Sequence, residues 1–168
     1  MLITQIILIG LLAFNAYHDF KYRNVFVFSL IALLADVLVY SAQNNSLVKS
    51  FNYVFINILL IGGIFILAYL IFTLMQKKFI NIKHVIGAGD ILFLLVVCFL
   101  FSPANFILFV ILSFCFSLFF YFLQSRETKS KHIPLIGTVS IPLMVLYLFN
   151  IFVSVDFYSD SWLLSLII

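Results

Sequence analysis

Residues 51–75 read FNYVFINILLIGGIFILAYLIFTLM, a run of 25 residues without a charged side chain. A helix that crosses the hydrocarbon core of a bilayer needs about 20 predominantly apolar residues. The run is continuous and does not alternate between apolar and polar with a period of two, so it predicts a helix and not a strand of a membrane barrel. This stretch therefore indicates a protein with at least one membrane-spanning helix.

The composition of the whole chain supports the same class. Hydrophobic residues make up 65% of the 168 residues and charged residues only 9%, whereas soluble domains contain roughly 45–50% apolar and roughly 25% charged residues. A soluble fold of this size would have to bury more than half of its residues, so a soluble enzyme and a disordered tail are both excluded. Residues 1–168 are expected to form a single membrane domain.

Five further apolar runs flank the decisive stretch. Together the six runs predict an all-α, polytopic membrane helix bundle of six transmembrane helices, at residues 2–17, 25–41, 51–75, 85–101, 106–123 and 133–155. The apolar tail at 161–168 is too short to span and is expected at the membrane interface. The first run has no basic segment before it and no clear cleavage site, so it is read as a retained helix.

Lysine and arginine are distributed unevenly between the runs. The first, third and fifth connections hold eight of the nine basic residues, namely Lys21, Arg23, Lys77, Lys78, Lys83, Arg126, Lys129 and Lys131. The positive-inside rule places these three connections in the cytoplasm. The sequence thus predicts a multi-pass protein of the inner (cytoplasmic) membrane with both termini outside.

Three acidic residues, Asp19, Asp36 and Asp90, lie at or near membrane depth. An acid in a membrane bundle is costly, so each is a candidate functional residue. Asp19 ends the first span, where the structural alternative is a solvated residue paired with Arg23 four positions later. Asp36 lies in the outer half of the second span and is expected to reach toward water or to pair with Asn57.

Asp90 belongs to the string Gly87-Ala88-Gly89-Asp90 that opens the fourth span. Only eleven residues separate Ile91 from Phe101 inclusive, so the glycine segment itself is expected to enter the membrane and carry Asp90 below the surface. The glycines would let another backbone approach the acid closely. The structural alternative is a glycine turn with Asp90 as the N-cap of the next helix.

The predicted topology places Asp19 and Asp90 at the same membrane face. Two carboxylates held together at low dielectric share one proton, because they cannot both ionise. The ionised group can then take a proton from water while the protonated group donates to a carbonyl oxygen or a leaving amine. Such a pair hydrolyses a peptide bond by general acid–base catalysis.

An acid after the first span, a short basic loop and a GxGD string that opens a later span resemble the type IV prepilin peptidases. The resemblance covers essentially the whole chain and implies a membrane aspartyl endopeptidase that removes the leader of pilin-like precursors at the cytoplasmic face. It implies Asp19 and Asp90 as the catalytic pair and Gly87 and Gly89 as motif glycines. His18, Arg23 and Lys83 are expected to modulate the pair.

The sequence departs from the family pattern beside both acids. Val25 follows Asn24 where Ile-Pro-Asn is usual, and Ile91-Leu92 follows the GxGD string where a small apolar residue and Lys are usual. By this resemblance the later Ile-Pro pair of the family corresponds to Ile133-Pro134, with proline in the first turn of a helix. The chain resembles the short form, without the zinc motif and the methyltransferase activity of the longer enzymes.

Three other functions were weighed. His18, His84 and His132 fall in the basic connections near the acids and could bind a metal, but no HExxH helix is present, and no metal or cofactor is expected. Acids within a bundle also suit a proton- or ion-coupled transporter. A noncatalytic membrane subunit that binds pilin-like helices is the third alternative. The expected partners are single-span pilin-like precursors and membrane lipid, with no nucleic acid.

Overall fold

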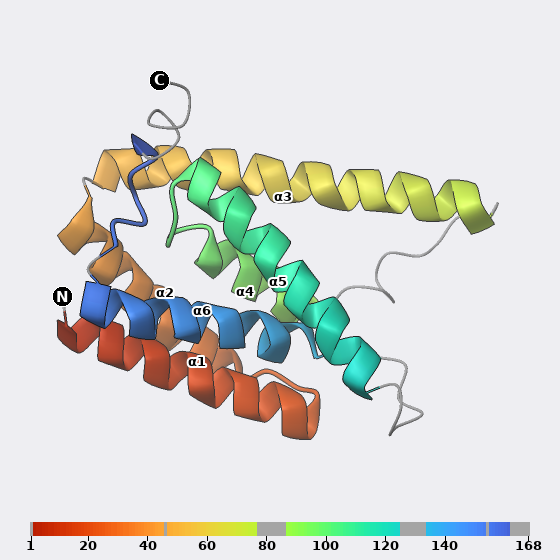
Figure 1. Cartoon of the computed structure of the whole chain (residues 1–168), viewed down its shortest axis with the longest axis horizontal. Helices are drawn as coiled ribbons and strands as arrows, with labels where there is room; N and C mark the ends of the chain where they lie inside the picture. The colour runs from red at the N-terminus through yellow and green to blue at the C-terminus, as the bar shows by residue number, and fades with distance from the viewer. Residues whose placement is uncertain (1, 46, 77–86, 125–133, 154, 162–168) are drawn as a thin grey trace.

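A computed structural model describes residues 2–45, 47–76, 87–124, 134–153 and 155–161 of the chain. It contains helices α1 (Leu2–Tyr22), α2 (Val27–Asn44), α3 (Leu47–Gln76), α4 (Ala88–Val97), α5 (Pro103–Gln124) and α6 (Leu135–Val153) (Figure 1). The described residues include no strand. The predicted all-α bundle with six helices is therefore confirmed.

Five of these helices, α1, α2, α3, α5 and α6, are long and apolar enough to cross a membrane. The exception is α4, which has 10 residues. At 1.5 Å per residue it is about 15 Å long, roughly half the thickness of a hydrocarbon core. The fourth run is thus short, as its sequence indicated, but its helix covers residues 88–97 and the rest of the predicted range after it forms turns.

The helix ends differ from the predicted ranges in one way that matters for function. α1 continues to Tyr22, five residues beyond the end of the apolar run, so Asp19 lies inside the last turn of the helix. The apolar run stops where the polar residues begin, whereas the helix continues as long as its buried face has a partner. The basic connections at 77–86 and 125–133 lie outside the described residues, and so does the tail at 162–168.

The bundle is organised around α6. This helix packs against α1, α4 and α5, and α2 packs against α1, α3 and α4. Ile136, Leu143 and Tyr147 of α6 are fully buried, whereas α3 lies along one side of the bundle with most of its apolar side chains exposed (Figure 1). Exposed apolar side chains of this kind are expected to face lipid, which is as apolar as they are.

The C-terminal end of α4 is held by a side chain of α3. Asn57 is fully buried, and its Nδ2 donates to the carbonyl oxygens of Cys98 and Phe101, each at 3.0 Å. The Tyr158 hydroxyl donates to the Phe99 carbonyl at 3.0 Å. Carbonyl groups at the end of a helix lack partners within it, and inside a bilayer water cannot replace them. These side chains therefore let α4 end at a depth where it could not otherwise end.

The expected pairing of Asp36 with Asn57 is wrong. The amide hydrogens of Asn57 are used by the end of α4, and the buried Oδ2 of Asp36 has no hydrogen-bond partner within the described part of the chain. The sequence placed Asp36 in the outer half of its span but could not show that the short α4 ends beside Asn57.

Candidate active site

Asp19 is buried at the end of α1, against the start of α6. Its side chain is 7% exposed, and its Oδ2 accepts a hydrogen bond from the backbone N–H of Gly137 at 2.7 Å. Gly137 is the third residue of α6, and the N–H groups of a first helical turn have no partner within the helix. Together with the helix dipole, they form a site for an anion. The Gly137 N–H and the start of α6 therefore favour the ionised form of Asp19, against the larger opposing effect of its burial.

Gly137 makes this contact possible because it has no side chain. A Cβ atom added at this position would lie 2.7 Å from Cε2 of Phe20, far inside van der Waals contact. A larger residue would separate α6 from α1 and lengthen the hydrogen bond to Asp19. The sequence analysis did not identify Gly137. The pattern that could have indicated Gly137 is a glycine three residues after a proline that precedes a helix.

Pro134 stands immediately before α6, which begins at Leu135. The expectation that this proline lies inside the first turn of the helix is therefore wrong by one residue. Its carbonyl accepts the N–H of Thr138 at 3.0 Å, which is the first hydrogen bond of the helix. The fixed φ of proline suits a helix start. The preceding Ile133 lies outside the described residues.

Asp90 is the third residue of α4, and Gly87 occupies the N-cap position. The Asp90 Oδ2 accepts the N–H of Gly87 at 3.3 Å, and the Asp90 N–H donates to the Gly87 carbonyl at 3.1 Å. The side chain thus satisfies a backbone donor at the start of the helix. The alternative that made Asp90 itself the N-cap is wrong by three positions.

The N-terminus of α4 is packed closely against two other segments. A Cβ atom on Gly89 would lie 3.3 Å from Cγ2 of Val25, in the connection between α1 and α2, and 3.9 Å from Cδ1 of Ile136. The close approach that the sequence analysis expected of the motif glycines is therefore seen at Gly89. Ile136 directly precedes Gly137, so the residues beside both acids contact the first turn of α6.

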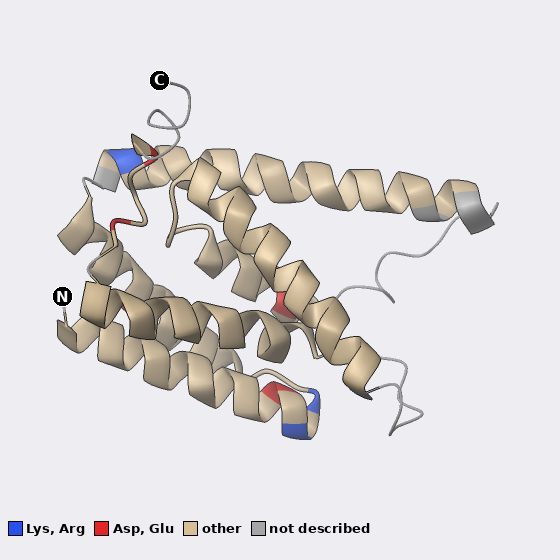
Figure 2. Cartoon of the chain, in the orientation of Figure 1, with Lys and Arg blue, Asp and Glu red and all other residues tan. Residues whose placement is uncertain are grey.

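The two acids lie within range of each other's charge. Burial raises the pKa of the Asp90 carboxyl, the Gly87 N–H lowers it, and the charge of Asp19 raises it further. Figure 2 shows the acidic residues of α1 and α4 toward the same end of the molecule, away from the acidic residues near the chain's C-terminus. The first and fourth apolar runs, separated by two helices in sequence, thus place their acids toward one end of the bundle, where the charge of Asp19 acts on Asp90.

The expected modulators differ in their positions. The N–H of Arg23 donates to the Asp19 carbonyl at 3.1 Å, and the positive charge of Arg23 acts on the Asp19 carboxylate. The His18 ring lies among aromatic rings, with centroids 4.6 Å from Phe14 and 5.1 Å from Tyr22. Lys83 lies outside the described residues.

His84 and His132, which the metal alternative requires, also lie outside the described residues. Among the residues that the structure does describe, no group of three or more His, Cys, Asp or Glu side chains gathers in one place.

A second polar contact lies one turn before Asp19 on α1. Asn15 is almost fully buried, and its Oδ1 accepts the hydroxyl of Ser29 on α2. Its Nδ2 donates to the carbonyl of Leu11 at 2.8 Å. This pair links α1 to α2 beside the acid-bearing turn and was not predicted from the sequence. The pattern that could have predicted it is that Asn15 and Asp19 are four residues apart, so both lie on the same face of the helix.

This geometry can support acid–base chemistry on a polar substrate. The Asp19 carboxyl accepts a hydrogen bond from a helix N-terminus, which favours its ionised form and offsets part of the cost of its burial. Partial burial and the charge of Asp19 push the Asp90 carboxyl toward its protonated form. Environments that separate the protonation of two neighbouring carboxyl groups provide an acid and a base at one pH.

The chain was compared with protein families, curated proteins and solved structures. The model of the type IV leader peptidase family matches residues 6–122, a range that contains both acids and the glycine string but not α6. No curated protein and no solved structure matches. Since the match covers well over half of the chain, and the helices are those of a multi-pass membrane protein, the chain belongs to the type IV leader peptidase family of proteases.

Proposed function

We propose that the protein is an aspartyl endopeptidase that cleaves the leader from pilin-like precursors at the cytoplasmic face of the inner membrane. The observation that supports the proposal is that Asp19 bonds to the first turn of α6 and that its charge acts on Asp90 at the start of α4. Family membership supports leader peptides as the substrate class. The basic residues Lys21 and Arg23, beside Asp19, support the cytoplasmic location of this end.

The surroundings of the two acids suggest different roles. The Gly137 N–H and the charge of Arg23 offset part of the cost of burying the Asp19 carboxylate. Within the described part of the chain, Asp90 has no such partners outside its own helix start, so we assign Asp19 the role of general base. Asp90 is half-buried and feels that negative charge, so we assign it the protonated form and the role of general acid. The shared proton belongs to the pair, and the two apparent pKa values of the rate profile belong to the pair as well.

The reaction then balances with water as the nucleophile. Asp19 takes a proton from water, the water oxygen bonds to the scissile carbonyl carbon, and Asp90 gives its proton to the carbonyl oxygen. In the second step Asp19 gives its proton to the leaving nitrogen as the C–N bond breaks, and a hydroxyl of the intermediate returns a proton to Asp90. The pair ends as it began, with no covalent intermediate.

The experiment is cleavage of a pilin-like precursor by the purified protein in lipid. Asp19→Asn and Asp90→Asn are compared with native protein and with Asp160→Asn, a matched change of an acid at the other end of the molecule. We expect the first two variants to be inactive, Asp160→Asn to retain activity, and a chelator to have no effect. Activity in either dyad variant would overturn the proposal.

The same variants separate the alternatives. A noncatalytic subunit would bind the precursor and cleave nothing in any form, whereas the proposed peptidase binds it in all forms and cleaves it only with both acids present. A transporter would move protons or ions across proteoliposomes and would need its acids for transport. Loss of cleavage on chelation would instead indicate a metal-dependent reaction.

A further inference from the structure

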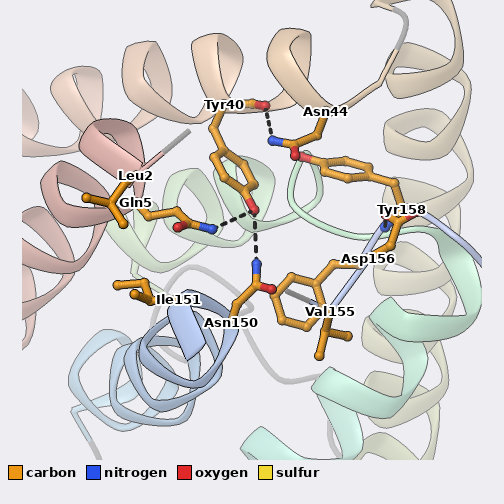
Figure 3. A pocket seen from close by; sticks show the side chains of 10 residues that line it. Leu2, Gln5, Tyr40, Asn44, Asn150, Ile151, Val155, Asp156 and Tyr158 are labelled. Atoms are coloured by element: carbon orange, nitrogen blue, oxygen red, sulfur yellow. Dashed lines mark hydrogen bonds between the residues drawn. The ribbon is translucent and has the colours of Figure 1, made fainter. Parts of the chain in front are cut away.

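Four helices of the bundle are aligned at the end away from the two acids, which we call the distal end. The Tyr40 hydroxyl on α2 accepts hydrogen bonds from Gln5 Nε2 on α1 at 3.4 Å and from Asn150 Nδ2 on α6 at 3.3 Å (Figure 3). The Ser41 hydroxyl on α2 donates to the Ser50 hydroxyl on α3 at 2.7 Å. Each of these residues lies in the first or last two turns of its helix, so α1, α2, α3 and α6 share a common level there.

From this common level the helices extend to different distances. α1, α2 and α6 contain 21, 18 and 19 residues, whereas α3 contains 30. At 1.5 Å per residue, the first three are about 27–32 Å long and α3 is about 45 Å long. For parallel axes, α3 therefore extends roughly 13–18 Å past the acid-bearing end of the bundle. Figure 1 shows α3 continuing beyond the adjacent ends of α1 and α6.

The extending part of α3 is apolar and exposed. The sequence has no charged residue between Lys49 and Lys77. In the last three turns of the helix, five large apolar side chains are 47–76% exposed, namely Ile66, Leu67, Leu70, Ile71 and Leu74. The Thr73 hydroxyl donates to the Tyr69 carbonyl of the same helix at 2.8 Å, so this polar group needs no water. A surface of this kind suits lipid and not water.

The end of α1 has the opposite character. Lys21 and Arg23 are exposed to the surroundings of the bundle. The Lys21 Nζ donates to the Tyr17 hydroxyl at 2.8 Å and lies 5.1 Å from the ring centroid of Tyr22. Both tyrosines are more than half exposed. Exposed tyrosines beside a basic residue are typical of the boundary between membrane and water, so α1 meets water near Lys21.

A flat bilayer of one thickness cannot fit both sides of the bundle. A surface at the end of α1 leaves the last three turns of α3 in water. A surface at the end of α3 places Lys21 and Arg23 in the hydrocarbon core, where a charge is costly. Because α3 runs in much the same direction as α1 and α6, a common tilt shortens all three and leaves the mismatch (Figure 1). A bilayer responds to a short hydrophobic span by thinning locally.

We propose that the bilayer is thinner beside α1 and α2 than beside α3, and that phospholipid covers α3 as far as Leu74. The thinned side is the side of Asp19, which lies two residues before Lys21 in the last turn of α1. Water then reaches the level of this carboxyl, although the helix that bears it is a membrane span. The inference concerns the lipid around the chain and does not depend on the peptidase reaction.

The test measures water contact with spin labels on the full chain in dioleoylphosphatidylcholine liposomes. Leu74→Cys places a label at the end of α3 and Phe28→Cys places one at the start of α2, where the native side chains are 76% and 75% exposed. Both variants carry Cys115→Ala, because Cys115 is exposed whereas Cys98 is buried. Collisions with oxygen, which concentrates in lipid, and with a nickel chelate, which stays in water, report the surroundings of each label.

Although Leu74 lies farther from the distal end than Phe28, we expect its label to collide with the chelate several-fold less often. Labels from Phe51→Cys and Val39→Cys, on exposed positions near the distal ends of α3 and α2, are the matched controls and should agree with each other, because they lie at one depth.

Two results would overturn the proposal. Chelate contact at Leu74 that equals or exceeds that at Phe28 would place the end of α3 in water, as in a flat bilayer. Low contact with both reagents at Leu74 would mean that a protein segment or a second copy covers α3 in place of lipid. The measurement needs no substrate, so its result is separate from that of the cleavage test.

Discussion

The hydrogen bonds from Asn57 to the end of α4 allow a quantitative prediction. Asn57→Leu keeps the branched shape of the side chain but removes the donor of two hydrogen bonds, leaving the buried carbonyls of Cys98 and Phe101 without it. A buried polar group left unsatisfied costs about 1–3 kcal/mol. The two carbonyls together would cost about 2–6 kcal/mol, but the substitution also removes the unpartnered Oδ1 of Asn57 itself. We therefore expect a net destabilisation of about 2–4 kcal/mol.

The assay is equilibrium unfolding in mixed micelles, followed by circular dichroism. Asn52→Leu is the matched control, because Asn52 is an exposed asparagine on the same helix. We expect its effect to stay within about 0.5 kcal/mol of native. Equal stability of the two variants would refute the view that the end of α4 depends on a donor from α3.

Three further predictions concern the acids. Gly137→Ala should lower cleavage at least tenfold, because the new Cβ would collide with Phe20 and displace the donor to Asp19; adding Phe20→Leu should restore part of the activity. Asp90→Asn should be more stable than native at neutral pH. Burial and the charge of Asp19 raise the Asp90 pKa, so the stability of the native protein falls as pH rises through that pKa. Thermal melting at several pH values should show that the difference between the two proteins disappears in acid. The cleavage rate of native protein should show two apparent pKa values that belong to the pair, and a profile with a single titration would contradict it.

Much of the fold could be predicted from apolar runs alone. The runs predicted six helices because a helix that crosses a membrane requires a long uncharged segment, and each run is longer than the apolar stretches of loops. That the fourth apolar run is short was also predicted, from the eleven residues between Ile91 and Phe101 inclusive. Helix ends were less predictable, since hydropathy records where polarity changes and not where backbone hydrogen bonding stops.

The two acids of the candidate site could be proposed from the sequence, whereas the residues that surround them could not. Asp19 and Asp90 were identifiable because acids are rare in this chain, and the glycine string marked a close approach that Gly89 makes. Gly137 and the pairing of Asn15 with Ser29 depend on which helices become neighbours, and apolar runs carry no information about that. For the same reason the Asn57 partner was assigned wrongly.

The central claim is that Asp19 and Asp90 act as one electrostatic pair. Infrared difference spectroscopy can follow the protonated carboxyl band of Asp90, identified by its loss in Asp90→Asn, as the pH is raised. We predict that Asp19→Asn shifts the titration of that band to lower pH, because the charge that raises the Asp90 pKa has been removed. A titration of Asp90 that is the same with and without the Asp19 carboxylate would contradict the pair and the mechanism built on it.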